Sequence, residues 1–195
     1  MKSYKILLAS GLLLTGMFSA CSKNDSLQQL ADITFRYTYQ QDVNANLPLV
    51  SNPSDTAIPS PVPIDNYSLP SYNFATNISQ IASNYNTSPE KLISVTVDSI
   101  LMGITAPPNL KLDFVKNMKL YISAKGQPEV LAAEKTSVPA GLRSLALDVS
   151  SGELKPYFQQ DTVRLRIVAS LTGIPPSATK INLKNIIKVV ANPLK

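Results

Sequence analysis

Two stretches, TVRLRIVASLT (162–172) and KINLKNIIKVVA (180–191), decide the fold class of this chain. Apolar side chains stand at every second position in the first stretch and over most of the second. A period of two is typical of a β-strand with one buried face, because successive strand residues point to opposite sides of the sheet. We therefore predict two strands that are buried on one face. Their predicted inward residues are Val163, Leu165, Ile167, Ala169, Leu171, Ile181, Leu183, Ile187 and Val189.

The stretch 93–105 allows a more specific prediction. Its apolar residues stand first at odd positions (Ile93, Val95, Val97) and then at even positions (Ile100, Met102, Ile104). A strand can keep both sets on one face only if an extra residue interrupts the alternation. We therefore predict a β-bulge, or a change from one sheet to the other, at Asp98–Ser99.

Shorter patterns complete the prediction for the domain. Further strands are expected at 33–39, 119–124, 129–134 and 145–149, and short helical segments at 77–85, 110–117 and 153–159. Residues 41–72 contain six prolines between 47 and 70, and we predict an irregular surface crossing there, with a second disordered linker as the alternative. About seven short strands separated by Pro and Gly predict a mainly β fold, an antiparallel β-sandwich with a few short helices.

Residues 1–20 have the features of a secretory signal peptide. Two lysines precede an apolar stretch at 6–17, and small residues then lead to the single cysteine of the chain. A basic start followed by roughly 7–15 apolar residues is typical of a signal peptide. A membrane-spanning helix needs about 20 apolar residues, so this stretch is too short to serve as one.

The sequence FSAC at 18–21 resembles the lipobox of bacterial lipoproteins, with Phe18 standing where leucine is commonest. The resemblance implies cleavage between Ala20 and Cys21, a diacylglycerol on the Cys21 sulfur and a further acyl chain, such as palmitate, on the new amine. One acyl chain binds a bilayer only marginally, whereas several make a lasting lipid anchor. The alternative is an ordinary export signal followed by an incidental cysteine.

The sequence SKND at 22–25 resembles the lysine-then-acidic signal of surface lipoproteins in the Bacteroidetes group. This resemblance implies a location in the cell outer membrane with display on its outer face, while a plain polar tether is the alternative. We predict that residues 21–31 form a lipidated flexible tether. Residues 32–195 are then expected to form a single β-sandwich domain that includes the Pro-rich crossing.

A further resemblance concerns LDFVK (112–116) and LYISAKGQPE (120–129). From Ser88 onward the chain is similar to uncharacterised β-sandwich lipoproteins of the Bacteroidetes group. The resemblance covers roughly half of the chain and implies a fold. It implies no activity, because those relatives have none assigned.

Composition argues against most catalytic chemistry. The chain has no histidine and one cysteine, so a Ser-His-Asp site, a histidine-ligated metal and a thiolate metal site are excluded. The formal net charge is +5, without the basic stripe and interleaved aromatic residues that indicate nucleic-acid binding. We expect no enzyme activity, cofactor or nucleic-acid partner. A surface hydrolase that uses two carboxylates is the remaining catalytic alternative.

Three candidate surface sites follow from the sequence. Tyr67 and Tyr72 in the Pro-rich crossing could contact a glycan, or could simply hold this crossing against the sandwich. Arg164 and Arg166 would share a basic patch with Lys184 and Lys188 if the strands at 162–172 and 180–191 pair. A solvated sheet face is the alternative to that patch. The triplet Asp55-Thr56-Ala57 resembles the O-glycosylation sequence of exported Bacteroidetes proteins, which points to Thr56.

These expectations combine into one description of the protein. The sequence predicts a lipid-anchored cell-envelope protein with a non-catalytic binding or structural role, whose partner is a polysaccharide or another envelope protein. A surface glycan-binding or adhesion module and a carboxylate-dependent hydrolase are the alternatives. The sequence does not indicate an oligomeric state.

Overall fold

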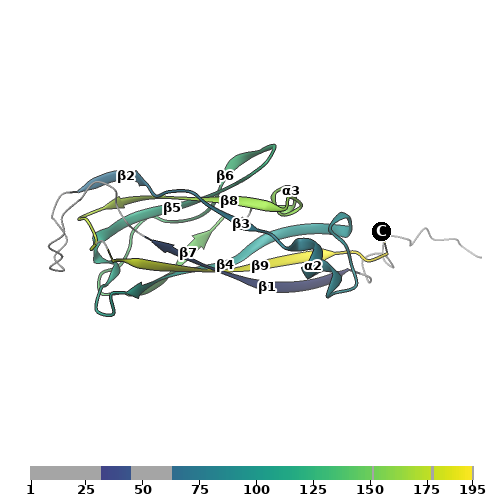
Figure 1. Ribbon diagram of the computed structural model, residues 1–195, viewed down its shortest axis with the longest axis horizontal. Helices are drawn as coiled ribbons and strands as arrows, with labels where there is room; N and C mark the ends of the chain where they lie inside the picture. Colours follow the sequence, from purple (N-terminus) through teal and green to yellow (C-terminus); the bar gives the residue numbers. More distant parts are fainter. Residues whose placement is uncertain (1–31, 45–62, 151, 177, 195) are drawn as a thin grey trace, which may run out of the picture.

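The computed structural model describes residues 32–44, 63–150, 152–176 and 178–194, and over these residues the chain is mainly β (Figure 1). Within these ranges the chain forms nine strands, two short α-helices and two 3-10 turns. In chain order these are β1 (Ile33–Asn44), β2 (Ile64–Ser68), β3 (Tyr72–Ala75), α2 (Ile78–Ser83), η1 (Pro89–Lys91), β4 (Leu92–Ala106), η2 (Leu112–Phe114), β5 (Val115–Ala124), β6 (Gln127–Lys135), β7 (Ser144–Val149), α3 (Lys155–Phe158), β8 (Thr162–Leu171) and β9 (Lys180–Ala191).

The strands form one antiparallel sheet that folds back on itself into two layers. The hydrogen-bonded order is β1-β9-β4-β7-β6-β5-β8-β2, and β3 also pairs with β8. The strand β7 joins the layers, because it pairs with β4 at Ile100↔Leu147 and with β6 at Ala133↔Val149. The antiparallel β-sandwich predicted from the sequence is thus confirmed, and Figure 1 shows β1, β4 and β9 in one layer and β5 and β8 in the other.

The core lies between these layers and is built from the alternating positions of the strands. All nine residues predicted to point inward on β8 and β9 are buried. Leu183 is fully buried on β9, the strand that lies between β1 and β4. The hydrophobic effect therefore selects this register, since a shift by one residue would expose every inward side chain of the strand.

The predicted bulge in β4 is also confirmed. Val97 pairs with Ile187 and Ser99 pairs with Ile186, so Asp98 is the extra residue. It lies on the outer face, where its carboxylate accepts a hydrogen bond from the Arg36 guanidinium at 2.8 Å. The prediction that Ile93 points inward is wrong, because a second irregularity falls between Leu92 and Ser94 and leaves Ile93 40% exposed.

The predicted irregular crossing at 41–72 contains more strand than expected. The strand β1 continues to Asn44, and β2 occupies Ile64–Ser68, while residues 45–62 lie outside the described part of the chain. With β3 just beyond, this region accounts for the strands above the predicted seven. The strand β2 lacks clean alternation and β3 is only four residues long, and both pair with the edge of β8. The helical segments predicted at 77–85, 110–117 and 153–159 correspond to α2, η2 and α3.

The two ends of the described domain lie at the same end of the sandwich. Ile33 pairs with Ala191, and the Asn192 amide donates a hydrogen bond to the Asp32 carboxylate at 2.8 Å. At the opposite end Asn44 and Ala106 both pair with Lys180. We call this opposite end, with the connections at 107–111, 136–143 and 172–176, the distal end (Figure 1).

Candidate functional site

The sandwich has a lateral seam between β1 and β3, which belong to the two ends of the strand order. Aromatic rings bridge this seam. The rings of Tyr39 on β1 and Phe74 on β3 are 4.4 Å apart between centroids, and Phe35 stacks on Tyr85, which follows α2, at 4.1 Å. The seam is therefore closed by side-chain contacts, in contrast to the β6–β7 side, where backbone hydrogen bonds join the layers.

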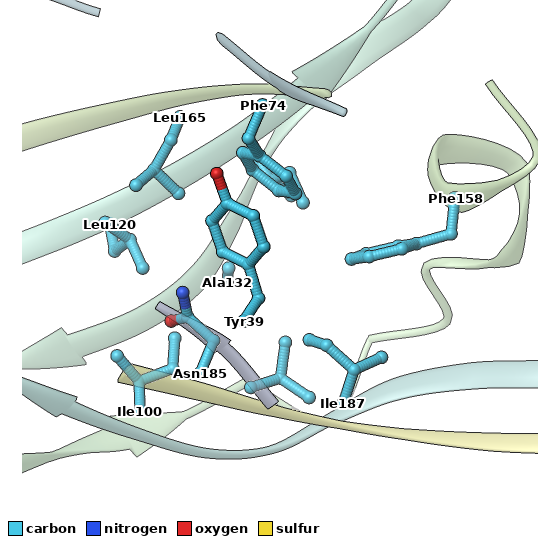
Figure 2. A pocket seen from close by; sticks show the side chains of 11 residues that line it. Tyr39, Phe74, Ile100, Leu120, Ala132, Phe158, Leu165, Asn185 and Ile187 are labelled. Carbon is cyan, nitrogen blue, oxygen red and sulfur yellow. The ribbon is translucent and has the colours of Figure 1, made fainter. Parts of the chain in front are cut away.

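A small cavity lies behind the Tyr39–Phe74 pair, between the two layers (Figure 2). The space open to the centre of a water molecule is about 20 Å³, and about 10–15 Å³ is enough to hold one water. The cavity therefore accommodates a water molecule or a group of similar size. Its lining residues are Tyr39, Phe74, Val97, Ile100, Leu120, Ile122, Ala132, Phe158, Leu165, Asn185 and Ile187.

Asn185 is the unusual residue of this cavity. It occupies an inward position of β9, flanked by the buried Leu183 and Ile187, and is 7% exposed. Its Oδ1 atom has no hydrogen-bond partner among the described residues. A buried acceptor without a partner costs about 1–3 kcal/mol of folding free energy. An apolar residue would avoid this cost, so the asparagine is a candidate for a role other than stability.

A second buried polar group lies close to the seam. Tyr37 lies on the same face of β1 as Tyr39. Its hydroxyl has no hydrogen-bond partner within the described residues, and burial raises the pKa of this phenol well above its usual range. The Tyr37 ring meets Phe158 edge-on, with centroids 6.4 Å apart. The neighbouring Tyr39 hydroxyl donates to Gln41 Oε1 at 2.9 Å, and partial burial raises its pKa as well.

Phe158 forms the end of the cavity and is placed there by α3. The backbone N–H of Leu154 donates to the Val95 carbonyl at 2.7 Å, which fixes the start of α3 against β4. Oε1 of Glu153 accepts hydrogen bonds from the backbone N–H groups of Val95 at 2.8 Å and Lys155 at 2.7 Å. The aromatic wall of the cavity therefore depends on one carboxylate that joins a helix to a central strand.

We expect Glu153→Gln to lower the free energy of unfolding by about 1 kcal/mol at pH 7. Desolvation raises the pKa of Glu153, but hydrogen bonds from Ser94, Val95, Lys155 and Leu154 outweigh it and leave that pKa below its usual value. A lowered folded pKa stabilises the protein above the unfolded pKa of about 4.3, and this contribution is lost as the pH falls through the folded value.

Urea unfolding of both proteins at pH 7 and at pH 3 measures this effect. The difference between wild type and Glu153→Gln is expected to shrink at the lower pH. Glu134→Gln is the matched control, since Glu134 faces Lys119 on the adjacent strand and should change stability little. An equal difference at both pH values would contradict the role of the ionised carboxylate.

The tyrosines predicted as glycan contacts pack against the core instead of standing free. Tyr67 and Tyr72 are half-buried, and burial is the main cause that raises the pKa of each phenol. Tyr67 lines a second, apolar cavity of about 30 Å³ together with Met102 and Met118. The positions of both residues agree with the alternative that they hold this part of the chain against the sandwich.

The condition on which the basic patch was predicted is not met. The strands β8 and β9 do not pair, because β8 lies between β5 and β2 whereas β9 lies between β1 and β4 in the other layer. Arg164 and Arg166 are thus separated from Lys184 and Lys188. Alternation along each strand is visible in the sequence, but the choice of neighbouring strand is not, which is why the patch prediction is wrong.

Arg166 takes part in a local cluster on the outer face of β8. Its guanidinium hydrogen-bonds to both carboxylate oxygens of Glu129 and lies 4.6 Å from the centre of the Tyr121 ring. The hydrogen bond from Arg166 lowers the pKa of Glu129. The charge of Arg166 is therefore largely compensated within the domain.

The remaining predicted sites, Cys21 with the cleavage position after Ala20 and Thr56, lie outside the described residues. No helix in the described ranges is long and apolar enough to cross a bilayer. Within the same ranges no group of three or more His, Cys, Asp or Glu side chains could hold a metal ion.

The sequence predictions missed the cavity, although one signal for it is present. Asn185 interrupts the inward apolar series 181, 183, 187 and 189 of the strand that otherwise shows the clearest alternation. The sequence carries no such signal for Phe158, because the position of its ring in the cavity depends on how α3 packs against β4. The chain matches no protein-family model, and no curated protein is similar to it in sequence. Its function therefore has to be inferred from the geometry described above.

Proposed function

We propose that the chain is a lipid-anchored protein of the bacterial cell envelope, displayed on the outer face of the outer membrane, with a non-catalytic binding or structural role. The observation that carries this proposal is the sequence FSAC at 18–21, and the shared end of β1 and β9 agrees with it. A tether at residues 21–31 joins the domain at Asp32, at the end opposite the distal end. Anchoring through Cys21 would therefore turn the distal loops away from the bilayer.

The attachment of β1 suits a tethered module. This strand continues directly from the tether and pairs with β9 without interruption from Ile33↔Ala191 to Asn44↔Lys180. A pull on the tether acts along this ladder, so many backbone hydrogen bonds share the load at once. The strand β9 is in turn held by β4 on its other side.

The distal end supports a binding or structural role because side chains fix its loops. Arg143 donates hydrogen bonds to the carbonyls of Ile104 and Leu110, both at 2.9 Å. The Asp113 carboxylate accepts a hydrogen bond from the Gly141 N–H at 2.5 Å. Pre-ordered loops lose less conformational entropy when a partner binds, which favours recognition of another envelope component.

Intact-mass spectrometry of the protein extracted with detergent from bacterial membranes tests the anchor. The expected species begins at Cys21 and carries a diacylglycerol and an additional acyl chain. The same gene with Cys21→Ser is the control, and its product should leave the membrane fraction, because the acyl chains supply the attachment. An unmodified Cys21 in membrane-extracted protein, or a Cys21→Ser chain that stays in the membrane fraction, would refute the proposal.

A further inference from the structure

We propose that the cavity behind the Tyr39–Phe74 pair is a binding site for an uncharged alkyl chain that carries a hydroxyl or amide hydrogen-bond donor. This inference goes beyond the anchoring role and is independent of it, since it depends only on residues inside the sandwich. Its starting point is Asn185, whose side chain lines the cavity from the central strand β9 (Figure 2).

The position of Asn185 favours a hydrogen-bond donor from outside the domain. The residue is more than nine-tenths buried, and its Oδ1 atom is unpartnered within the described residues. A buried water typically makes about three hydrogen bonds to polar groups. Among the lining side chains only Asn185 and Tyr39 carry polar atoms, and the Tyr39 hydroxyl already donates to Gln41. A water would be poorly held here, whereas a ligand can combine a donor with an apolar body.

The other residues that line the cavity determine which kind of ligand fits beside the hydrogen-bond donor. Leu120 and Ile122 of β5 and Leu165 of β8 form an apolar wall opposite Asn185, and Figure 2 shows Leu120 and Leu165 on that side. Among the described residues no lysine or arginine lines the cavity, so a carboxylate or phosphate head group would find no counter-charge from them. The matching ligand is therefore an alkyl chain whose polar group is an uncharged donor.

Entry of such a chain requires one side chain to move. The present space holds only a group of about the size of water. Tyr39 is half-buried on β1, and its ring contacts Phe74 while its hydroxyl binds Gln41 two residues along. Both contacts are made by side chains at the seam, so the Tyr39 ring can rotate outward without breaking the β1–β9 ladder.

The test uses ¹³C-methyl NMR of the mature chain, residues 21–195, carrying Cys21→Ser, so that it does not depend on whether the wild type is lipidated. The probes are 1-hexanol and 1-chlorohexane, which differ in the hydroxyl group. We expect saturable shifts at the methyl groups of Leu120, Ile122 and Leu165 with 1-hexanol, and at least tenfold weaker binding of 1-chlorohexane. A methyl group remote from the cavity, such as that of Leu112, should not shift.

Asn185→Leu provides the decisive comparison. This variant places an apolar side chain of similar length at an inward position, so it should remain folded, and its spectrum verifies this directly. It is expected to lose the preference for 1-hexanol over 1-chlorohexane. The proposal is overturned if neither probe gives saturable shifts in the wild-type sequence, if the two probes bind equally, or if Asn185→Leu retains the preference.

Discussion

Deleting Thr96 is expected to lower the free energy of unfolding by about 2.5–6 kcal/mol, a large part of the roughly 5–15 kcal/mol of a typical domain. With Val97 kept in register with Ile187, the deletion turns Val95 outward and Ser94 inward. Val95 is fully buried, and exposing it costs about 1.5–3 kcal/mol. Burying the Ser94 hydroxyl without a partner adds about 1–3 kcal/mol.

Deleting Asp98 instead is the matched control, and it is expected to leave the protein folded. Asp98 is the extra residue of the bulge, so its removal makes Val97 and Ser99 consecutive. Their partners Ile187 and Ile186 are consecutive on β9, so the two strands would then pair as in a regular ladder. Every inward side chain keeps its face, and the surface ion pair with Arg36 is worth at most about 1 kcal/mol. Urea unfolding of both variants measures the contrast. Equal losses of stability would show that the bulge does not set the register of β4.

Replacing Phe158 by alanine is expected to lower the free energy of unfolding by about 3–5 kcal/mol. The ring is 2% exposed and lies within 6.4 Å, between ring centroids, of both Tyr37 and Phe74. Its removal would enlarge the cavity around Asn185 and take away one of the buried side chains that hold α3 against the core. Denaturant unfolding gives the loss directly.

Phe158→Leu separates the loss of volume from the loss of the ring. Leucine keeps an apolar side chain at this position, so a clearly smaller destabilisation is expected. Gln159→Ala, at the exposed next position of the chain, should change stability little. If Phe158→Ala proved as stable as the wild type, the assignment of Phe158 to the core would be contradicted.

The local structure of the longer strands could be predicted from the sequence. Along β8, β9 and β4 the burial of alternate residues dominates, so the inward faces and even the bulge at Asp98 follow from the order of apolar side chains. Ile93 is an exception to the rule that alternate apolar residues are buried. It is apolar and in step with Val95, yet a second irregularity next to Leu92 leaves it exposed.

Strand pairing and the candidate site could not be predicted in the same way. Alternation shows which side of a strand is buried, but it does not show which strand lies beside it. The proposed grouping of Arg166 with Lys184 therefore failed once β8 and β9 proved to lie in different layers. The strands β2 and β3 were missed because pairing with β8 overrides their weak local pattern. The cavity requires both layers at once, and only Asn185 signalled it.

The shared end of β1 and β9 has a practical consequence for protein engineering. If Cys21 is the anchor, a reporter protein fused beyond Leu194 would emerge from the end of the domain that faces the bilayer. The same reporter inserted between Thr136 and Gly141, in the connection from β6 to β7, would extend from the far pole of the domain. The chain would then serve as a display scaffold through an internal loop and not through its carboxyl terminus.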